Sequence, residues 1–153
     1  MKTIASFEVD HTKLVPGIYI SRIDGDITTY DLRFVVPNGG AYLPVAAMHT
    51  IEHLFAVYAR NSAYGAHIIY FGPMGCRTGF YLLVRDADHT KVLDLIRDCA
   101  DFVIGFDGQI PGCSLRECGN YLEHDLAAAK QACAEYAQKI ASWTPQDLAY
   151  VKA

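Results

Sequence analysis

Two histidines and a glutamate lie within five residues of one another, in the order His49-Thr-Ile-Glu52-His53. They belong to a stretch over 48–60 that is mostly apolar, has no glycine or proline and follows Pro44, which predicts a buried helix. At about 100° per residue, the three side chains share one helix face. Two imidazoles one turn apart can chelate a divalent ion, and the carboxylate between them can move protons beside it.

The plainer alternative is that these three residues are polar groups satisfied within a core. Burying three such groups together costs free energy unless they share partners or a metal, because each of them loses its hydration. We therefore favour a metal site over this alternative.

A metal held by His49 and His53 needs at least one more ligand. The candidates are Cys118, Cys113, Cys76, His67, His89 and His124. Cys118 is favoured because it lies just ahead of a helix predicted to begin near 119–120, where the helix dipole and free amides favour a thiolate. A His2Cys set leaves a fourth position for water or substrate, as in catalytic sites, whereas Cys118 taken alone would be an ordinary loop thiol.

Cys76 lies in a glycine-rich bend over 72–79, next to Arg77. A neighbouring cation and a nearby metal favour the thiolate, so Cys76 is a candidate for carrying protons. The alternatives are a buried inert cysteine or a fourth metal ligand. Together with Glu52 and an open Lewis-acid position, such a thiol suits proton transfer next to a carbonyl, as in isomerases and lyases, while hydrolysis stays open.

The elements that must position these groups follow from apolar periodicity and turn residues. Strands are predicted at 18–23, 27–36, 67–71 and 80–84, and helices at 48–60, from 86–90 to about 105, from about 119 to 142, and from Thr144-Pro145. This order, with hairpin-length turns, predicts an α+β two-layer sandwich: a mainly antiparallel sheet with helices packed on one face. Cys99 and Cys133 fall on apolar helix faces, so packing is their expected role.

Length and composition predict one globular domain over residues 1–153, with 52% apolar and 20% charged residues. A net charge of −4 and the lack of a basic run argue against nucleic acid and anionic membranes as partners. No apolar stretch reaches the roughly 18 residues of a membrane span, and no secretory signal is visible. The five unpatterned cysteines are therefore expected to be reduced thiols in a cytoplasmic protein.

Five blocks of the sequence carry a family likeness when they are taken together. They are Ser-Phe-Glu-Val-Asp-His at 6–11, Tyr-Asp-Leu-Arg-Phe at 30–34, His-Thr-Ile-Glu-His at 49–53, Gly-Pro-Met-Gly-Cys-Arg-Thr-Gly-Phe at 72–80 and Cys-Gly-Asn at 118–120. In order and spacing they resemble the S-ribosylhomocysteine lyase (LuxS) family over nearly the whole chain. One departure is Tyr70, where many members carry an acidic residue, and it touches the expected pocket wall.

The resemblance implies a metal-dependent carbon–sulfur lyase that cleaves S-ribosylhomocysteine to homocysteine and 4,5-dihydroxy-2,3-pentanedione. The second product is the precursor of autoinducer-2, a quorum-sensing signal, and the reaction also recycles a by-product of S-adenosylmethionine-dependent methylation. The resemblance further implies one Fe(II) per subunit, replaceable by zinc or cobalt, held by His49, His53 and Cys118 plus water. It also implies a homodimer with its active sites at the subunit interface.

Two kinds of site residue follow from the same resemblance. Cys76 would carry protons during carbonyl migration, and Glu52 would act as acid and base in the β-elimination. Ser6, His11 and Arg33 would bind the substrate. Each of the last three has a plainer alternative: a solvated strand charge for Arg33, and ordinary polar residues for Ser6 and His11.

Two other classes of protein share part of this pattern. An inverzincin-like metal-dependent hydrolase also contains His-x-x-Glu-His, with the glutamate activating a metal-bound water and a distant glutamate as third ligand. Such enzymes are several times longer and have no use for Cys76. A non-catalytic metal-binding or sensor protein would instead coordinate its metal fully.

Overall fold

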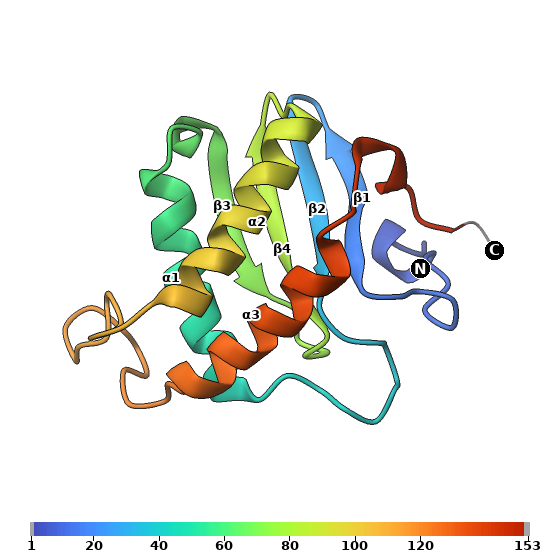
Figure 1. The fold of residues 1–153 in the computed structure, drawn as a ribbon. Coiled ribbons are helices and arrows are strands. Elements are labelled where there is room, and N and C mark those ends of the chain that lie inside the picture. The colour runs from blue at the N-terminus through green and yellow to red at the C-terminus, as the bar shows by residue number, and fades with distance from the viewer. Residues whose placement is uncertain (1, 152–153) are drawn as a thin grey trace.

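The computed structural model describes residues 2–151 and arranges them as one sheet covered by helices (Figure 1). Strands β1 (Gly17–Asp24), β2 (Ile27–Arg33), β3 (Ile68–Pro73) and β4 (Gly79–Arg85) pair antiparallel in the order β1-β2-β4-β3. Helices α1 (Val45–Asn61), α2 (His89–Gly105) and α3 (Leu126–Ile140) all lie on one face of this sheet. The predicted α+β two-layer sandwich is confirmed.

The strands follow the alternation of their side chains. Leu32 of β2 pairs with Phe80 of β4, and Tyr30 pairs with Leu82, and all four side chains are buried beneath the helices. Because successive side chains of a strand point to opposite faces, the charged residues between them are directed to the other face of the sheet. The β1–β2 hairpin turns on Gly25, whose φ of 61° is the left-handed conformation that a two-residue hairpin loop requires.

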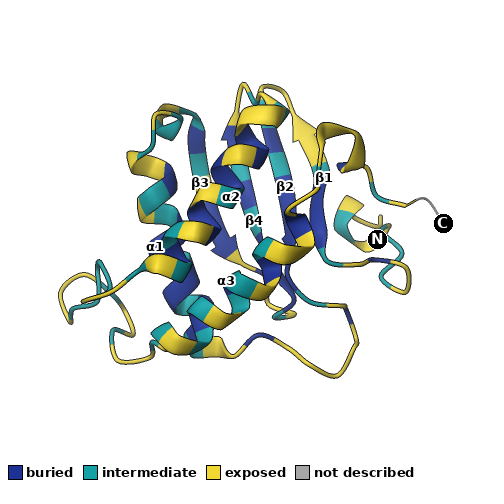
Figure 2. Cartoon of the chain, viewed as in Figure 1, coloured by how far each residue is buried: buried dark blue, intermediate teal, exposed yellow. Residues whose placement is uncertain are grey.

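The core lies between the sheet and the inner sides of the helices (Figure 2). Cys99 of α2 and Cys133 of α3 are fully buried in it, which confirms their predicted packing role. Burial raises the pKa of Cys133 to about 12, and burial with the nearby Asp98 also raises the pKa of Cys99. Neither thiol is therefore ionised at neutral pH.

Three predicted boundaries are wrong. Helix α1 begins at Val45 rather than at residue 48, directly after Pro44. Strand β2 ends at Arg33 rather than at residue 36, because the N–H groups of Phe34 and Val35 both donate to the Thr78 carbonyl instead of continuing a ladder. Helix α3 begins at Leu126 rather than near 119–120, since the Asp125 side chain accepts from the Ala128 N–H and caps the helix there. Residues 119–122 form turns instead.

The short C-terminal helix is confirmed as a 3-10 turn, Pro145–Asp147. Thr144 and Asp147 form a reciprocal capping box around it, and Pro145 occupies the first helical position, as predicted. None of the helices described has the length and apolar character needed to cross a bilayer.

The two ends of the described chain lie together beside β1, as Figure 1 shows. The N–H of Ile20 in β1 donates to the carbonyl of Leu148 at 2.7 Å. The Tyr150 ring stacks on Tyr19 with their centroids 5.0 Å apart. The C-terminal segment is therefore packed on the sheet.

Candidate metal centre and reactive thiol

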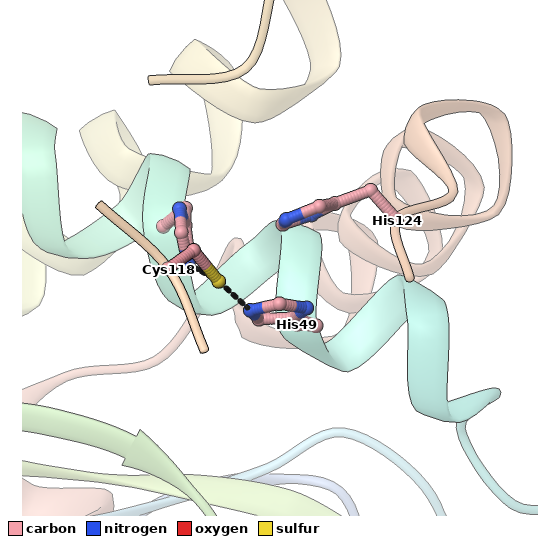
Figure 3. Close-up of side chains that lie close together, drawn as sticks. His49, Cys118 and His124 are labelled. Atoms are coloured by element: carbon pink, nitrogen blue, oxygen red, sulfur yellow. Dashed lines mark hydrogen bonds between the residues drawn. The ribbon is translucent and has the colours of Figure 1, made fainter. Parts of the chain in front are cut away.

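Four side chains of metal-ligating type converge near the start of α1. His49 and His53 project from α1, Cys118 comes from the loop over 106–125, and His124 lies just before α3 (Figure 3). One potential ligand atom from each lies within 4.8 Å of the others. The structure thus brings together the three predicted ligands, His49, His53 and Cys118, and adds His124 to them.

Backbone carbonyls of the same loop orient the two helix histidines. The Nδ1 of His49 is 2.8 Å from the carbonyl of Glu123, and the Nδ1 of His53 is 2.7 Å from the carbonyl of Pro111. A carbonyl can only accept, so each Nδ1 carries the hydrogen and each Nε2 presents a lone pair. This is the tautomer that metal-binding histidines use, with the outer nitrogen held by a carbonyl.

The spacing of the donors fits a divalent ion. The Cys118 Sγ lies 3.4 Å from His49 Nε2 and 3.9 Å from His53 Nε2. A tetrahedral zinc-type ion, with its usual bond lengths to sulfur and nitrogen, would place the two atoms about 3.6 Å apart. The observed distances bracket this value, so His49, His53 and Cys118 fit the metal that the sequence predicts.

Cys118 reaches this position for a different reason from the one predicted. Since α3 begins at Leu126, Cys118 does not lie at a helix N-terminus, and the argument from the helix dipole is wrong. The Asn120 N–H lies 3.4 Å from the Cys118 sulfur and donates to it within a local turn. The thiol is placed by this turn and by the loop's contacts with α1.

His124 was only one of several candidate third ligands in the sequence. Its Nδ1 lies 3.1 Å from the Thr50 hydroxyl, and its ring stacks on His49 at a centroid distance of 4.0 Å. Its Nε2 is buried and has no hydrogen-bond partner within the described residues. Burial and the neighbouring His49 and His53 lower the pKa of His124, so the ring is neutral at pH 7. The sequence did contain a hint that His124 lies near the metal site, because it is only six residues from Cys118 in the same loop.

The remaining candidate ligands lie elsewhere among the described residues. The Cys113 thiol donates to a backbone carbonyl at 3.0 Å, and the His67 ring contacts another at 2.9 Å. His89 lies 2.6 Å from the Tyr30 hydroxyl. Cys76 is also outside the cluster.

Glu52 is half-buried on α1, on the turn between the two histidines. It is not among the side chains grouped as potential ligands within the described part of the chain. Its carboxylate therefore fits a role in proton transfer better than one in metal binding.

Cys76 lies at the β3–β4 turn. Its side chain is exposed and forms part of a second site on the molecule. It lines a hollow of about 280 Å³ together with His11, Tyr42 and Thr78. The Cys76 sulfur lies 3.1 Å from the Thr78 hydroxyl and 3.9 Å from the Nη1 of Arg33. The alternative of a buried inert cysteine is therefore wrong.

The cation that faces Cys76 is Arg33 and not its sequence neighbour Arg77. The Arg77 Nε donates to the Leu43 carbonyl at 2.9 Å. Arg33 is only 3% exposed, so the alternative of a solvated strand charge is wrong too. Burial alone would lower the pKa of Arg33, but the ion pair with Asp31 outweighs it and raises the pKa, so the guanidinium stays charged.

The three predicted substrate-binding residues divide between two hollows. His11 and Thr78 line the hollow at Cys76, and the buried Arg33 reaches its edge through the hydrogen bond to Thr78. Ser6 instead lines a separate hollow of about 480 Å³ on the sheet face away from the helices, with Tyr70 in its wall. Tyr70 thus lies where the sequence placed it, on a pocket wall.

The fold and these two sites define a small α+β protein with a candidate mononuclear metal centre of His2Cys type and a separate, exposed thiol. The model of the S-ribosylhomocysteinase (LuxS) family matches residues 4–147, and the chain belongs to this family. It is 44% identical to an S-ribosylhomocysteine lyase of Finegoldia magna, over 98% of this chain and 99% of that protein. It is 46% identical to the protein of the same name from Borreliella afzelii, again over 98% and 99% of the two chains.

Proposed function

We propose that this chain is a metal-dependent S-ribosylhomocysteine lyase, a single domain over residues 1–153. It would cleave S-ribosylhomocysteine to homocysteine and 4,5-dihydroxy-2,3-pentanedione. The observation that carries the proposal is the convergence of His49, His53 and Cys118 at metal-ligand spacing, in a chain that belongs to the LuxS family over most of its length. The family membership favours this function over the inverzincin-like hydrolase.

We propose Fe(II) as the metal, one per subunit, with zinc or cobalt able to replace it. His49, His53 and Cys118 would hold it, because they present two nitrogen lone pairs and one sulfur at the right spacing. When bound, such an ion supplies Lewis-acid polarisation of a substrate carbonyl, which acidifies the neighbouring C–H.

Cys76 would carry the proton that moves during carbonyl migration. As a thiolate it removes a proton from the carbon next to the carbonyl and returns it to the adjacent carbon, so that the carbonyl shifts by one position. Two such steps bring the carbonyl to the position β to the thioether-bearing carbon. The Arg33 guanidinium at 3.9 Å and the Thr78 hydroxyl at 3.1 Å favour the negative charge that this role requires.

Glu52 would serve the elimination that follows. Removal of a proton from the carbon between the carbonyl and the thioether carbon expels homocysteine as a thiolate, and a second proton then neutralises that sulfur. Glu52 lies one helical turn from His49 on the same side of α1, and it is half-buried. It can therefore reach a substrate held at the metal centre.

Substrate binding is proposed for Ser6, His11 and Arg33. His11 shares the Cys76 hollow, and its Nδ1 is held 2.8 Å from the Val9 carbonyl, which leaves Nε2 for a substrate hydroxyl. Arg33 would act from beneath, through its Nη1. Ser6 lines the larger hollow on the open face of the sheet.

We propose that the protein forms a homodimer with its active sites at the subunit interface. In support, Ser6 and Cys76 line different hollows of one chain, and pairing of two chains would let Ser6 of one face Cys76 of the other across one substrate. Phe7, next to Ser6 in the sequence, and Tyr70 in the wall of the Ser6 hollow are 76% and 50% exposed, so both rings are available for contact with a second chain. The expected mass from sedimentation is twice that of one chain, and a monomeric mass with full activity would contradict the proposal.

We also propose a cellular role, on the basis of the family membership. The five free cysteines fit a reducing, cytoplasmic location. There the enzyme would serve methionine metabolism through the activated methyl cycle, and its second product would feed autoinducer-2 synthesis and quorum sensing. The net charge of −4 fits a small-molecule substrate and no nucleic-acid partner.

A thiol-release assay tests the proposed activity. Anaerobically prepared, iron-loaded protein is mixed with S-ribosylhomocysteine, and free homocysteine is followed with a thiol reagent while the diketone is trapped by derivatisation. The two products should appear in equal amounts. A protein that holds its metal but releases neither product would overturn the lyase assignment.

A further inference from the structure

A buried ion pair lies on the face of the sheet away from the helices. Asp31 and Arg33, two residues apart on β2, are 0% and 3% exposed. The Arg33 Nη2 is 2.5 Å from Asp31 Oδ2, and its Nε is 3.1 Å from Oδ1, so the contact is bidentate. Burying two charges costs free energy that apolar residues at these positions would avoid.

The ion pair leaves one nitrogen of the guanidinium, Nη1, available for other contacts. With Nε and Nη2 held by Asp31, Nη1 donates to the Thr78 hydroxyl at 2.7 Å and lies 3.9 Å from the Cys76 sulfur. Thr78 in turn lies 3.1 Å from that sulfur. Asp31 thus sets the direction in which Arg33 points at the thiol.

Asp31 accepts a third hydrogen bond from a second partner, which lies near the C-terminal end of the described chain. The Tyr150 hydroxyl donates to Asp31 Oδ2 at 2.6 Å. The Tyr150 ring is fixed by stacking on Tyr19, and the preceding Leu148 carbonyl is bound by β1. Burial and the Asp31 carboxylate raise the pKa of Tyr150, so its hydroxyl keeps the hydrogen that it donates.

We propose that Tyr150 is a positioning residue for the reactive thiol: by holding Asp31, it keeps Arg33 aimed at Cys76 and Thr78. Tyr150 lies beyond residues 4–147, which the family model matches, so family membership does not assign this role. The proposal rests on the proposed function only where it takes Cys76 as the reactive thiol. The geometry of the relay is independent of that function.

Loss of the Tyr150 hydroxyl has a definite consequence for the thiol. The hydrogen bond to a carboxylate is charge-assisted, and it takes up part of the negative charge of Asp31. Without it, the Asp31 carboxylate loses one of the contacts that fix its position, so the Arg33 Nη1 is held less firmly against Thr78 and the sulfur. The Cys76 thiolate is then less stabilised and reacts more slowly.

Alkylation of Cys76 in the metal-loaded full chain tests this relay. The rate of carboxamidomethylation by iodoacetamide at pH 7 is followed by mass spectrometry of the peptide that contains Cys76. Tyr150→Phe, which keeps the stacked ring, should slow the reaction about three- to tenfold, which is part of the effect of losing one hydrogen bond to a charged group. Tyr58→Phe is the matched control, because Tyr58 packs on Phe102 on the helical side, and its rate should equal that of the wild type.

Two further readouts separate positioning from a general loss of structure. The Tyr150→Phe variant should retain its metal content, and a chain ending at Ala149 should show the same slowing of alkylation. With S-ribosylhomocysteine, kcat should fall by a similar factor while KM stays unchanged. If the wild type shows no turnover, the proposed function fails while the alkylation result still stands. Equal alkylation rates in Tyr150→Phe and wild type would overturn the positioning role.

Discussion

The metal centre and the Cys76 site are held in place by different means. At the metal centre, backbone carbonyls of the loop over 106–125 fix His49 and His53 from outside. At the thiol, the surroundings of Cys76 are instead held in place by a buried pair of charged side chains, Asp31 and Arg33. A site held by the backbone tolerates the loss of a neighbouring side chain, whereas a site held by a charge pair fails when either partner is removed. The two sites should therefore respond separately to substitution.

The largest expected effect is at the metal centre itself. Cys118→Ala removes one of three proposed ligands and should weaken metal binding by more than about a hundredfold, beyond the loss typical of outer-sphere changes. Metal content after dialysis measures this loss, and homocysteine release should disappear with it. The alkylation rate of Cys76 should change little, and a large fall in that rate would show that the two sites are one.

Glu52→Gln, a change within α1, tests whether a residue beside the metal ligands affects turnover without affecting metal binding. The variant keeps the shape of the side chain and should keep the metal, because Glu52 lies outside the ligand cluster. Homocysteine release should fall by about 10²–10⁴-fold, the usual contribution of a general acid or base. Metal analysis and the thiol-release assay are run on the same sample. Release at the wild-type rate would remove Glu52 from the mechanism.

Arg33→Met tests the charge pair at the other site. The variant leaves Asp31 buried without its partner, which should lower the free energy of unfolding by about 3–5 kcal/mol. Arg22→Met is the matched control, because Arg22 pairs with Asp24 on the surface of β1, and such exposed pairs are worth about 0–1 kcal/mol. Urea unfolding of the two variants gives the difference. Equal stabilities would mean that the buried pair contributes nothing.

The smallest expected effect concerns Thr50, which supports His124. The Thr50 hydroxyl donates to the Ala46 carbonyl and lies 3.1 Å from His124 Nδ1. Thr50→Val removes this support and should weaken metal binding by no more than about tenfold, the low end for an outer-sphere partner. Competition with a chelator measures the affinity. A loss as large as that of Cys118→Ala would make the His124 side of the cluster as important as the ligands.

Local patterns in the sequence predicted much of the fold and of the metal centre. The apolar run after Pro44 is α1, and His49 and His53 share one of its faces as the helical period requires. The start of α3 was predicted too early, near 119–120, because it depends on the Asp125 cap and on a loop held against α1. Cys118 lies at ligand spacing from His49 and His53, as predicted, but the physical reason given for it was wrong.

The thiol site was less predictable because its contacts join distant parts of the chain. Arg33 meets Thr78, 45 residues away, and Asp31 meets Tyr150, 119 residues away. The neighbour in sequence, Arg77, points at the Leu43 carbonyl instead. Burial of a charge depends on such long-range contacts, and periodicity along one strand does not reveal them.

Cys76→Ala most directly tests the claim that metal binding and proton transfer belong to two separate sites. Metal content and homocysteine release are measured on one anaerobic sample of the variant, beside the wild type. We expect a full complement of metal and no homocysteine, because the proposed ligands remain in place while the proposed proton carrier is gone. Release at the wild-type rate, or loss of the metal with the thiol, would contradict the separation of the two sites.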